Sequence, residues 1–168
     1  PGDLRLPPWF TGNSALSIFG QVRGKELTRP GGELAEKFAL DLTVRVRAMS
    51  RGMRQKLGLI LALVHSPRLL ILDEPTSSLD PLIQQVLLAQ LRELSAAGHT
   101  VFFSSHSLSE VEQLCSRVAI VREGKLVADE TLATLRTRAG HEVTIFWSDL
   151  SGAANRDPEQ YAEPDAFD

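Results

Sequence analysis

Four consecutive apolar residues, Leu69 to Leu72, are followed at once by the acidic pair Asp73 and Glu74. A short run with no polar residue inside it is typical of a strand covered on both faces, as in a parallel sheet. Open α/β sheets bind their ligands at the carboxyl ends of such strands. The sequence therefore predicts an α/β fold with a candidate site at Asp73 and Glu74.

Helix and strand patterns alternate after this run, whereas the part of the chain before it is mostly helical. We expect helices over 14–21, 33–42, 51–65, 81–97, 108–114 and 131–137. We expect strands over 69–72, 100–104, 117–122, 125–128 and 142–147. Asn13 or Ser14 is expected to cap the first helix, and the Pro and Gly residues of 29–32 predict a break before the second. This order favours a helical subdomain followed by an α/β sheet.

Capping residues mark the start of three later helices. Ser50 is suited to accept a backbone N–H at the start of one helix, and Asp80 precedes a proline at the start of the next. Ser107 and Glu110 have the spacing of a capping box. We therefore expect a Ser107→Ala substitution to weaken its helix by about 1 kcal/mol.

Composition excludes several classes of protein. The 168 residues contain a single cysteine, Cys115, which rules out an internal disulfide, and no His/Cys cluster has zinc-ligand spacing. The longest apolar run, 57–64, is shorter than a membrane span. A chain of this length can bury a hydrophobic core without disulfides or metal ions.

Charge is unevenly distributed within a net charge of −3. Residues 1–60 carry ten Lys or Arg against five acids, but these charges are interleaved, which is typical of a solvated helical face. We therefore expect no nucleic-acid partner. Residues 148–168 carry one Arg and six acids with few apolar residues, which predicts an acidic, flexible tail.

Four short motifs follow one another along the chain. Met49–Met53 stands at the start of a helix, Leu69–Asp73 has the Walker B pattern, Ser78–Asp80 follows it, and Ser104–His106 ends the second strand. A carboxylate after a buried strand can hold Mg²⁺ through water, and a second acid can orient or deprotonate an attacking water.

In this order and spacing the motifs closely resemble those of the ATP-binding subunits of ATP-binding cassette (ABC) transporters. The resemblance covers about 1–136. It implies a P-loop NTPase-type core, partial and with a mainly parallel sheet, beside an α-helical subdomain. It also implies that Asp73 supports Mg²⁺, that Glu74 activates water, that His106 senses the γ-phosphate and that Asp80 couples two sites across a dimer.

The segment 49–53, which resembles the family's Leu-Ser-Gly-Gly-Gln signature, departs from it at two positions that matter for phosphate binding. Arg51 replaces the first glycine and Met53 the glutamine, whereas Ser50 and Gly52 are kept. A hydroxyl and the free N–H groups of a helix N-terminus suit a γ-phosphate. The resemblance therefore implies that Ser50 to Met53 bind nucleotide, and the variant is similar to the ABC-2 type exporter branch.

A phosphate loop of the form Gly-x-x-x-x-Gly-Lys-[Ser/Thr] is expected upstream of residue 1, together with the family's glutamine loop. The nearest match, 20–26, has three residues between its glycines and Glu26 where a hydroxyl is needed. We therefore expect the chain to be the C-terminal part of such an ATPase. Its predicted parts are a helical subdomain (1–66), the second part of the ATPase core (67–147) and the tail (148–168).

The resemblance implies a homo- or heterodimer of ATPase subunits that sandwiches two ATP molecules with Mg²⁺. Integral membrane permease subunits would hold this dimer at the cytoplasmic face of the membrane and convert its closure into transport. Two alternatives remain open: a soluble ABC ATPase without a transport role, and a non-catalytic regulatory or dimerisation module. The fragment by itself is expected to have little ATPase activity, because the phosphate loop supplies most of the grip on the nucleotide.

Overall fold

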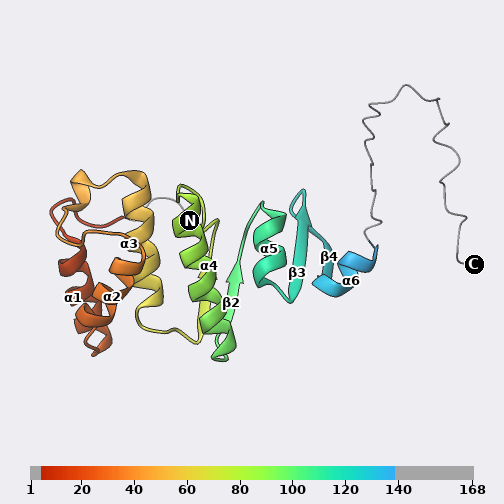
Figure 1. Ribbon diagram of the computed structural model, residues 1–168, viewed down its shortest axis with the longest axis horizontal. Helices are drawn as coiled ribbons and strands as arrows, with labels where there is room; N and C mark the ends of the chain where they lie inside the picture. Colours follow the sequence, from red (N-terminus) through yellow and green to blue (C-terminus); the bar gives the residue numbers. More distant parts are fainter. Residues whose placement is uncertain (1–4, 139–168) are drawn as a thin grey trace, which may run out of the picture.

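The computed structural model describes residues 5–138. Its elements lie along one long axis, with α1–α3 at one end and the β3–β4 hairpin with α6 at the other (Figure 1). The helical elements are α1 (Gly12–Arg23), α2 (Thr28–Lys37), the 3₁₀ helix η1 (Val46–Ala48), α3 (Arg51–Leu63), α4 (Pro81–Ala96), α5 (Leu108–Leu114) and α6 (Leu132–Arg138). The strands are β1 (Leu69–Leu72), β2 (Thr100–Phe103), β3 (Arg117–Arg122) and β4 (Lys125–Thr131). The predicted strand 142–147 and acidic tail 148–168 lie outside the described residues.

One hydrophobic core joins the helical end to the first sheet. Its fully buried side chains include Leu16 from α1, Phe38 after α2, Leu57 and Ile60 from α3, and Leu87 from α4. The predicted helices therefore form because each has one apolar face that the others cover. Among residues 5–138, no helix combines the length and the apolar character needed to cross a bilayer.

The first helix begins earlier than the sequence predicts. Thr11, and not Asn13 or Ser14, is its N-cap: the Thr11 hydroxyl accepts the Ser14 N–H at 3.2 Å, and Ser14 Oγ accepts the Thr11 N–H at 2.8 Å. This reciprocal pair satisfies two backbone donors at once. Asn13 is exposed in the first turn.

The break predicted over 29–32 is wrong, because α2 runs through it and ends at Lys37, before the predicted end at 42. Pro30 is the third residue of α2, where a helix has no use for a backbone N–H. Gly31 packs against Leu16, and a Cβ there would lie 2.5 Å from both Leu16 δ-carbons. Close packing of α1 on α2 thus explains a glycine that local propensity disfavours.

Strands β1 and β2 form a parallel pair, in the register Leu70 with Val101 and Leu72 with Phe103. The prediction that both faces of β1 are covered is wrong for the described residues. Leu70 is buried, but Ile71 is 68% exposed and the neighbouring Phe102 is 60% exposed. Helices α3 and α4 belong to the core on the Leu70 side, and no described element covers the other face.

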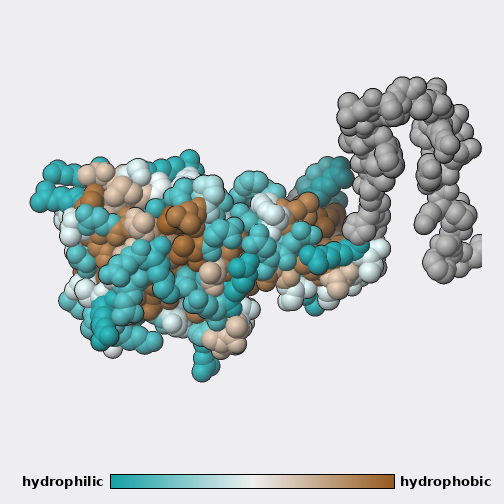
Figure 2. Space-filling model, viewed as in Figure 1, coloured by the Kyte–Doolittle hydropathy of each residue, from teal (hydrophilic) through white to brown (hydrophobic). Residues whose placement is uncertain are grey.

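Strands β3 and β4 form a separate antiparallel hairpin, as predicted, with a turn at Glu123 and Gly124. Both turn residues have positive φ, 52° and 73°, as a type I′ turn requires. The described residues therefore contain two two-stranded sheets, one parallel and one antiparallel. Figure 2 shows hydrophobic surface over the hairpin, where Ile120 and Leu126 are exposed.

The capping box predicted for α5 is wrong. Ser107 is its N-cap residue but makes no side-chain capping bond, and its Oγ lies 2.9 Å from Ser109 Oγ. Glu110 is buried and accepts a hydrogen bond from Ser105 Oγ at 2.6 Å. Glu110 pairs with Ser105, and Ser107 pairs with Ser109, so neither side chain of the expected box caps the helix backbone. The cost expected for Ser107→Ala therefore no longer applies.

Substituting alanine at two adjacent glycines of α2 tests the packing of α1 on α2. Gly31→Ala should destabilise the fold by about 1–3 kcal/mol, because its Cβ overlaps Leu16. Gly32→Ala, whose Cβ meets nothing within 4 Å, should be neutral or stabilising by up to about 1 kcal/mol. Urea unfolding followed by circular dichroism measures both, and equal effects would contradict the packing.

His65, just after α3, should make stability depend on pH. Burial, aided by Arg23 and Lys25, lowers the pKa of its imidazole from 6.5, and a backbone hydrogen bond with Leu61 opposes this shift only in part. The unfolded chain therefore binds more protons, so this contribution to stability is complete above about pH 6.5 and falls as the solution becomes more acidic. Urea midpoints at pH 7.5 and 5.5 should differ less in a His65→Gln variant than in the wild type.

Candidate functional site

The Ser104 hydroxyl joins the two carboxylate residues at the carboxyl edge of the parallel sheet. It accepts the Glu74 backbone N–H at 2.9 Å and donates to Asp73 Oδ1 at 2.6 Å. The parallel pairing of β1 and β2 produces this contact, because Ser104 follows β2 just as Asp73 follows β1. The hydroxyl therefore fixes the backbone of Glu74 and the carboxylate of Asp73 relative to the end of β2.

Glu74 and His106 form the second close contact of this edge, with His106 Nδ1 2.6 Å from Glu74 Oε2. An ionised carboxylate only accepts hydrogen bonds, so the imidazole donates from Nδ1. His106 comes from the loop after β2, whose shape Ser105 holds by donating to Glu110 and accepting the Ser107 N–H at 3.0 Å. The structure thus brings together three predicted residues, Asp73, Glu74 and His106, on one edge.

Glu74 has a left-handed backbone, with φ of 45°, which is unfavourable for a residue with a Cβ. Its neighbours hold it there: Ser104 accepts its N–H, and its carbonyl accepts the Ser77 N–H at 3.1 Å. Backbone strain of this kind persists where surrounding contacts determine the conformation, and it is common at functional sites. From this backbone conformation the Glu74 side chain meets His106.

The other nucleotide-binding candidates lie at the N-terminus of α3. Ser50 caps this helix by accepting the Met53 N–H at 3.2 Å, which confirms its predicted capping role. Arg51 is exposed in the first turn, whereas the Met53 side chain packs against the core. The nucleotide-binding roles of Ser50, Arg51, Gly52 and Met53 stay predictions; the Met53 side chain packs on the core and its N–H is held by Ser50.

Asp80 is the N-cap of α4, with Oδ1 accepting the Ile83 N–H at 3.0 Å. That hydrogen bond, aided by Lys56, whose Nζ lies 3.7 Å from Oδ2, lowers the pKa of the carboxyl below its usual value. The carboxylate is thus ionised and bonded to the start of α4. A coupling role across a dimer, as predicted, would have to operate with Asp80 in this position.

Asp73 is the predicted magnesium ligand. The described residues contain no group of three or more His, Cys, Asp or Glu side chains able to hold a metal ion. Mg²⁺ usually takes one or two carboxylates and completes its shell with water and substrate phosphates. A single carboxylate at a sheet edge, oriented by Ser104, therefore fits an ion that is bound together with a nucleotide.

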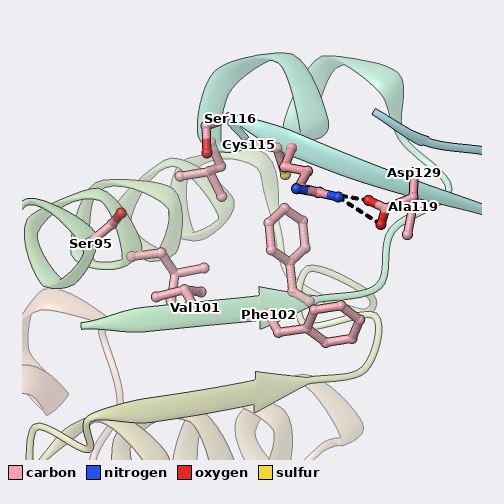
Figure 3. Close-up of a pocket in the computed structure, with 11 residues that line it drawn as sticks. Ser95, Val101, Phe102, Cys115, Ser116, Ala119 and Asp129 are labelled. Atoms are coloured by element: carbon pink, nitrogen blue, oxygen red, sulfur yellow. Dashed lines mark hydrogen bonds and ion pairs between the residues drawn. The ribbon is translucent and has the colours of Figure 1, made fainter. Parts of the chain in front are cut away.

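A cavity of about 400 Å³ lies between β2 and the β3–β4 hairpin (Figure 3). Val101 and Phe102 of β2 line one side, and Arg117 and Asp129 of the hairpin line the other. Arg117 holds Asp129 through two hydrogen bonds of 2.7 and 2.9 Å, which lower the pKa of that carboxyl. Because β2 and β3 are not paired with each other, the cavity separates two sheet edges that face it.

Sequence reasoning gave no role to Ser104, although it named the strand end that contains it. A hydroxyl one residue beyond the neighbouring parallel strand is the signal that could have found it. It also missed Gln84 of α4, whose Nε2 donates to the carbonyls of Thr76 and Leu79 at 3.4 and 3.2 Å. These residues hold the backbone beside the acidic pair and contribute no charge, so no motif marks them.

A family model described as "AAA domain, putative AbiEii toxin, Type IV TA system" matches residues 24–112, more than half of the chain.

The chain belongs to the ATP-binding proteins of ABC transporters, as its relatives show. It is 32% identical to the Linearmycin resistance ATP-binding protein LnrL of Bacillus subtilis (strain 168), over 90% of this chain and 50% of the relative. It is 36% identical to Nod factor export ATP-binding protein I of Burkholderia lata, over 74% and 42%. A solved structure titled "Structure of ATP binding subunit of ABC transporter" matches with a TM-score of 0.75 at 30% identity, over 82% and 60%.

The chain spans about half the length of the curated relatives that it matches. The predicted family and P-loop NTPase-type fold are thus confirmed. The roles of the individual site residues and the three domain boundaries stay predictions.

Alanine substitution of the two N-cap residues Asp80 and Ser107 should affect stability differently. Asp80→Ala removes the acceptor of the Ile83 N–H and should lower the thermal unfolding midpoint, whereas Ser107→Ala removes no capping bond and should leave it nearly unchanged. The Asp80 effect should shrink in acid, because protonation of a carboxyl whose pKa is lowered on folding removes the same stabilisation. Differential scanning calorimetry of both variants at pH 7 and pH 3 measures this.

Proposed function

We propose that this chain supplies the Walker B, signature and switch-histidine parts of an ATP-hydrolysing ABC transporter subunit. The paired contacts Ser104–Asp73 and Glu74–His106, both 2.6 Å, are the observation that carries the proposal. They place two carboxylates and an imidazole at the edge where α/β sheets bind nucleotides.

Glu74 is the proposed general base of hydrolysis. Its carboxylate takes a proton from the attacking water while the water oxygen bonds to the γ-phosphorus, and the bond to the β,γ-bridging oxygen breaks to give ADP and phosphate. A bound Mg²⁺ supplies positive charge to the phosphate oxygens. Asp73 is the residue that would hold this ion, because Ser104 orients its carboxylate at the same edge.

His106 orients the Glu74 carboxylate through its Nδ1. In the neutral ring with a proton on Nδ1, Nε2 is an acceptor and does not bind a phosphate oxygen. Sensing of the γ-phosphate by His106 therefore requires either a doubly protonated ring or release of Glu74. If His106 leaves Glu74 to bind the γ-phosphate, the Glu74 carboxylate is released when ATP binds.

A second polypeptide segment must bring the phosphate loop to this edge. The exposed face at Ile71 and Phe102 and the cavity between β2 and β3 support this, because both are surfaces that a sheet domain normally covers. We propose that ATP is bound between such a segment and the carboxylate edge.

In a homo- or heterodimer, the N-terminus of α3, with Ser50, Arg51 and Gly52, contacts the γ-phosphate of the ATP that the second subunit binds. Arg51, exposed in the first turn, adds a positive charge that the glycine of the common signature lacks. Integral membrane permease subunits are the proposed partners that keep the dimer at the cytoplasmic face of the membrane. The Nod factor export relative favours an exporter, and the signature variant with Arg51 and Met53 is similar to the ABC-2 type.

A chimera tests this function: the phosphate-loop segment of a relative such as the linearmycin resistance protein is joined to residues 1–168. The chimera should hydrolyse ATP with Mg²⁺, and Glu74→Gln should still bind ATP but lose about 10²–10⁴-fold in turnover, the usual contribution of a general base. Phosphate release and nucleotide binding are measured separately.

The 168-residue chain without that segment is the control and should show little turnover. Full activity of the Glu74→Gln chimera would exclude Glu74 as the base. A folded chimera that binds no ATP would instead favour the non-catalytic module, and an active one that fails to associate with a permease would favour the soluble ATPase.

A further inference from the structure

The loop between β1 and α4 is held from the helical end of the molecule by Gln55, a side chain with no role in the function proposed above. Gln55 is half-buried in the second turn of α3, and its Nε2 donates to the Pro75 carbonyl oxygen at 3.2 Å. Pro75 is the residue after Glu74 and is buried. A buried carbonyl needs a donor, so this bond fixes the backbone beside the proposed base.

Two further contacts join the same helix to the same loop. A Cβ on Gly52 would lie 2.9 Å from the Ser78 carbonyl oxygen, and Lys56 Nζ lies 3.7 Å from Asp80 Oδ2. Residues 52, 55 and 56 are spaced three and four apart, so they occupy one face of α3. One helical face therefore follows the loop from Pro75 to Asp80.

The backbone at Glu74 and Pro75 is thus fixed from two directions. Ser104 holds the Glu74 N–H from the end of β2, and Gln55 holds the Pro75 carbonyl from α3. Ser50, the proposed phosphate contact, is the N-cap of the same helix. A movement of α3 toward a phosphate would therefore pull on the peptide next to Glu74 and change its position relative to His106.

We propose that Gln55 is a positioning residue that couples the N-terminus of α3 to the Glu74 carboxylate. The functional meaning of this coupling rests on the proposed function, whereas the coupling itself rests on the contacts above. In the proposed dimer, the phosphate at α3 belongs to one nucleotide and Glu74 acts on the other. Gln55 then links the two nucleotide sites through a single amide.

The first test uses the wild-type and variant 168-residue chains with ¹⁵N-labelled histidine. Gln55→Met keeps the side-chain length but has no N–H donor, so the His106 Nδ1–H resonance should move toward that of a free imidazole as Glu74 shifts. Gln90→Met is the matched control, since Gln90 of α4 bonds to Lys37 and Glu93 on the surface. A folded Gln55→Met chain with the wild-type His106 resonance overturns the proposal.

A measurement on the wild-type chain needs no variant to fold. One Gln55 Nε2–H should exchange with solvent more slowly than those of Gln85, which is exposed on α4. Equal exchange of the two side chains means that the bond to Pro75 is absent and also overturns the proposal.

The second test uses the chimera described above. Gln55→Met should lower kcat by about tenfold to a hundredfold, the cost expected of a misplaced catalytic group, with the KM for ATP within about twofold of the wild type. Gln90→Met should change neither. An unchanged kcat overturns the coupling, whereas an inactive wild-type chimera contradicts the proposed function and leaves the histidine resonance to decide about Gln55.

Discussion

The parallel pairing of β1 with β2 determines where the proposed chemistry lies. Leu72 faces Phe103 in the register, so the residues that follow the two strands emerge at the same edge. Asp73 and Ser104 therefore meet at 2.6 Å, and Glu74 and His106 meet one step farther from the sheet. A shift of the register by one residue would separate both pairs and turn Leu70 out of the core.

The helical end of the molecule is attached to this edge through the loop that contains Ser78 and Asp80. Gly52 and Gln55 of α3 contact the loop from one side, and Gln84 of α4 holds its carbonyls from the other. The loop is thus a junction between the helix terminus suited to an anion and the carboxylates suited to hydrolysis. This junction physically connects the signature segment at the start of α3 with the Walker B carboxylates after β1 within one chain.

The two open surfaces of the sheets have a common explanation. Ile71 and Phe102 expose one face of the parallel sheet, and the cavity beside Val101 separates β2 from the hairpin. Hydrophobic sheet surface is normally covered by another layer. The chain spans about half the length of its relatives, so a segment with a phosphate loop is the proposed cover, and the same segment would complete the nucleotide site.

The sequence by itself determined the family, the order of the motifs and most of the elements, because these depend on local patterns. The run at 69–72, the cap at Ser50 and the turn at Glu123 and Gly124 are all found as predicted. The motifs lie at strand ends and helix starts, where side chains and unpaired backbone N–H groups can contact a ligand, and the sequence pattern predicts the positions of both.

Only the tertiary structure decided the features that depend on distant neighbours. Gly31 continues a helix because Leu16 fills the space beside it, and the expected Ser107–Glu110 box gives way to a bond from Ser105. Likewise Ser104 and Gln55 act through contacts that span about thirty and twenty residues of chain. Local patterns record what a residue prefers, but the free energy of a buried contact depends on which distant atoms the fold brings to it.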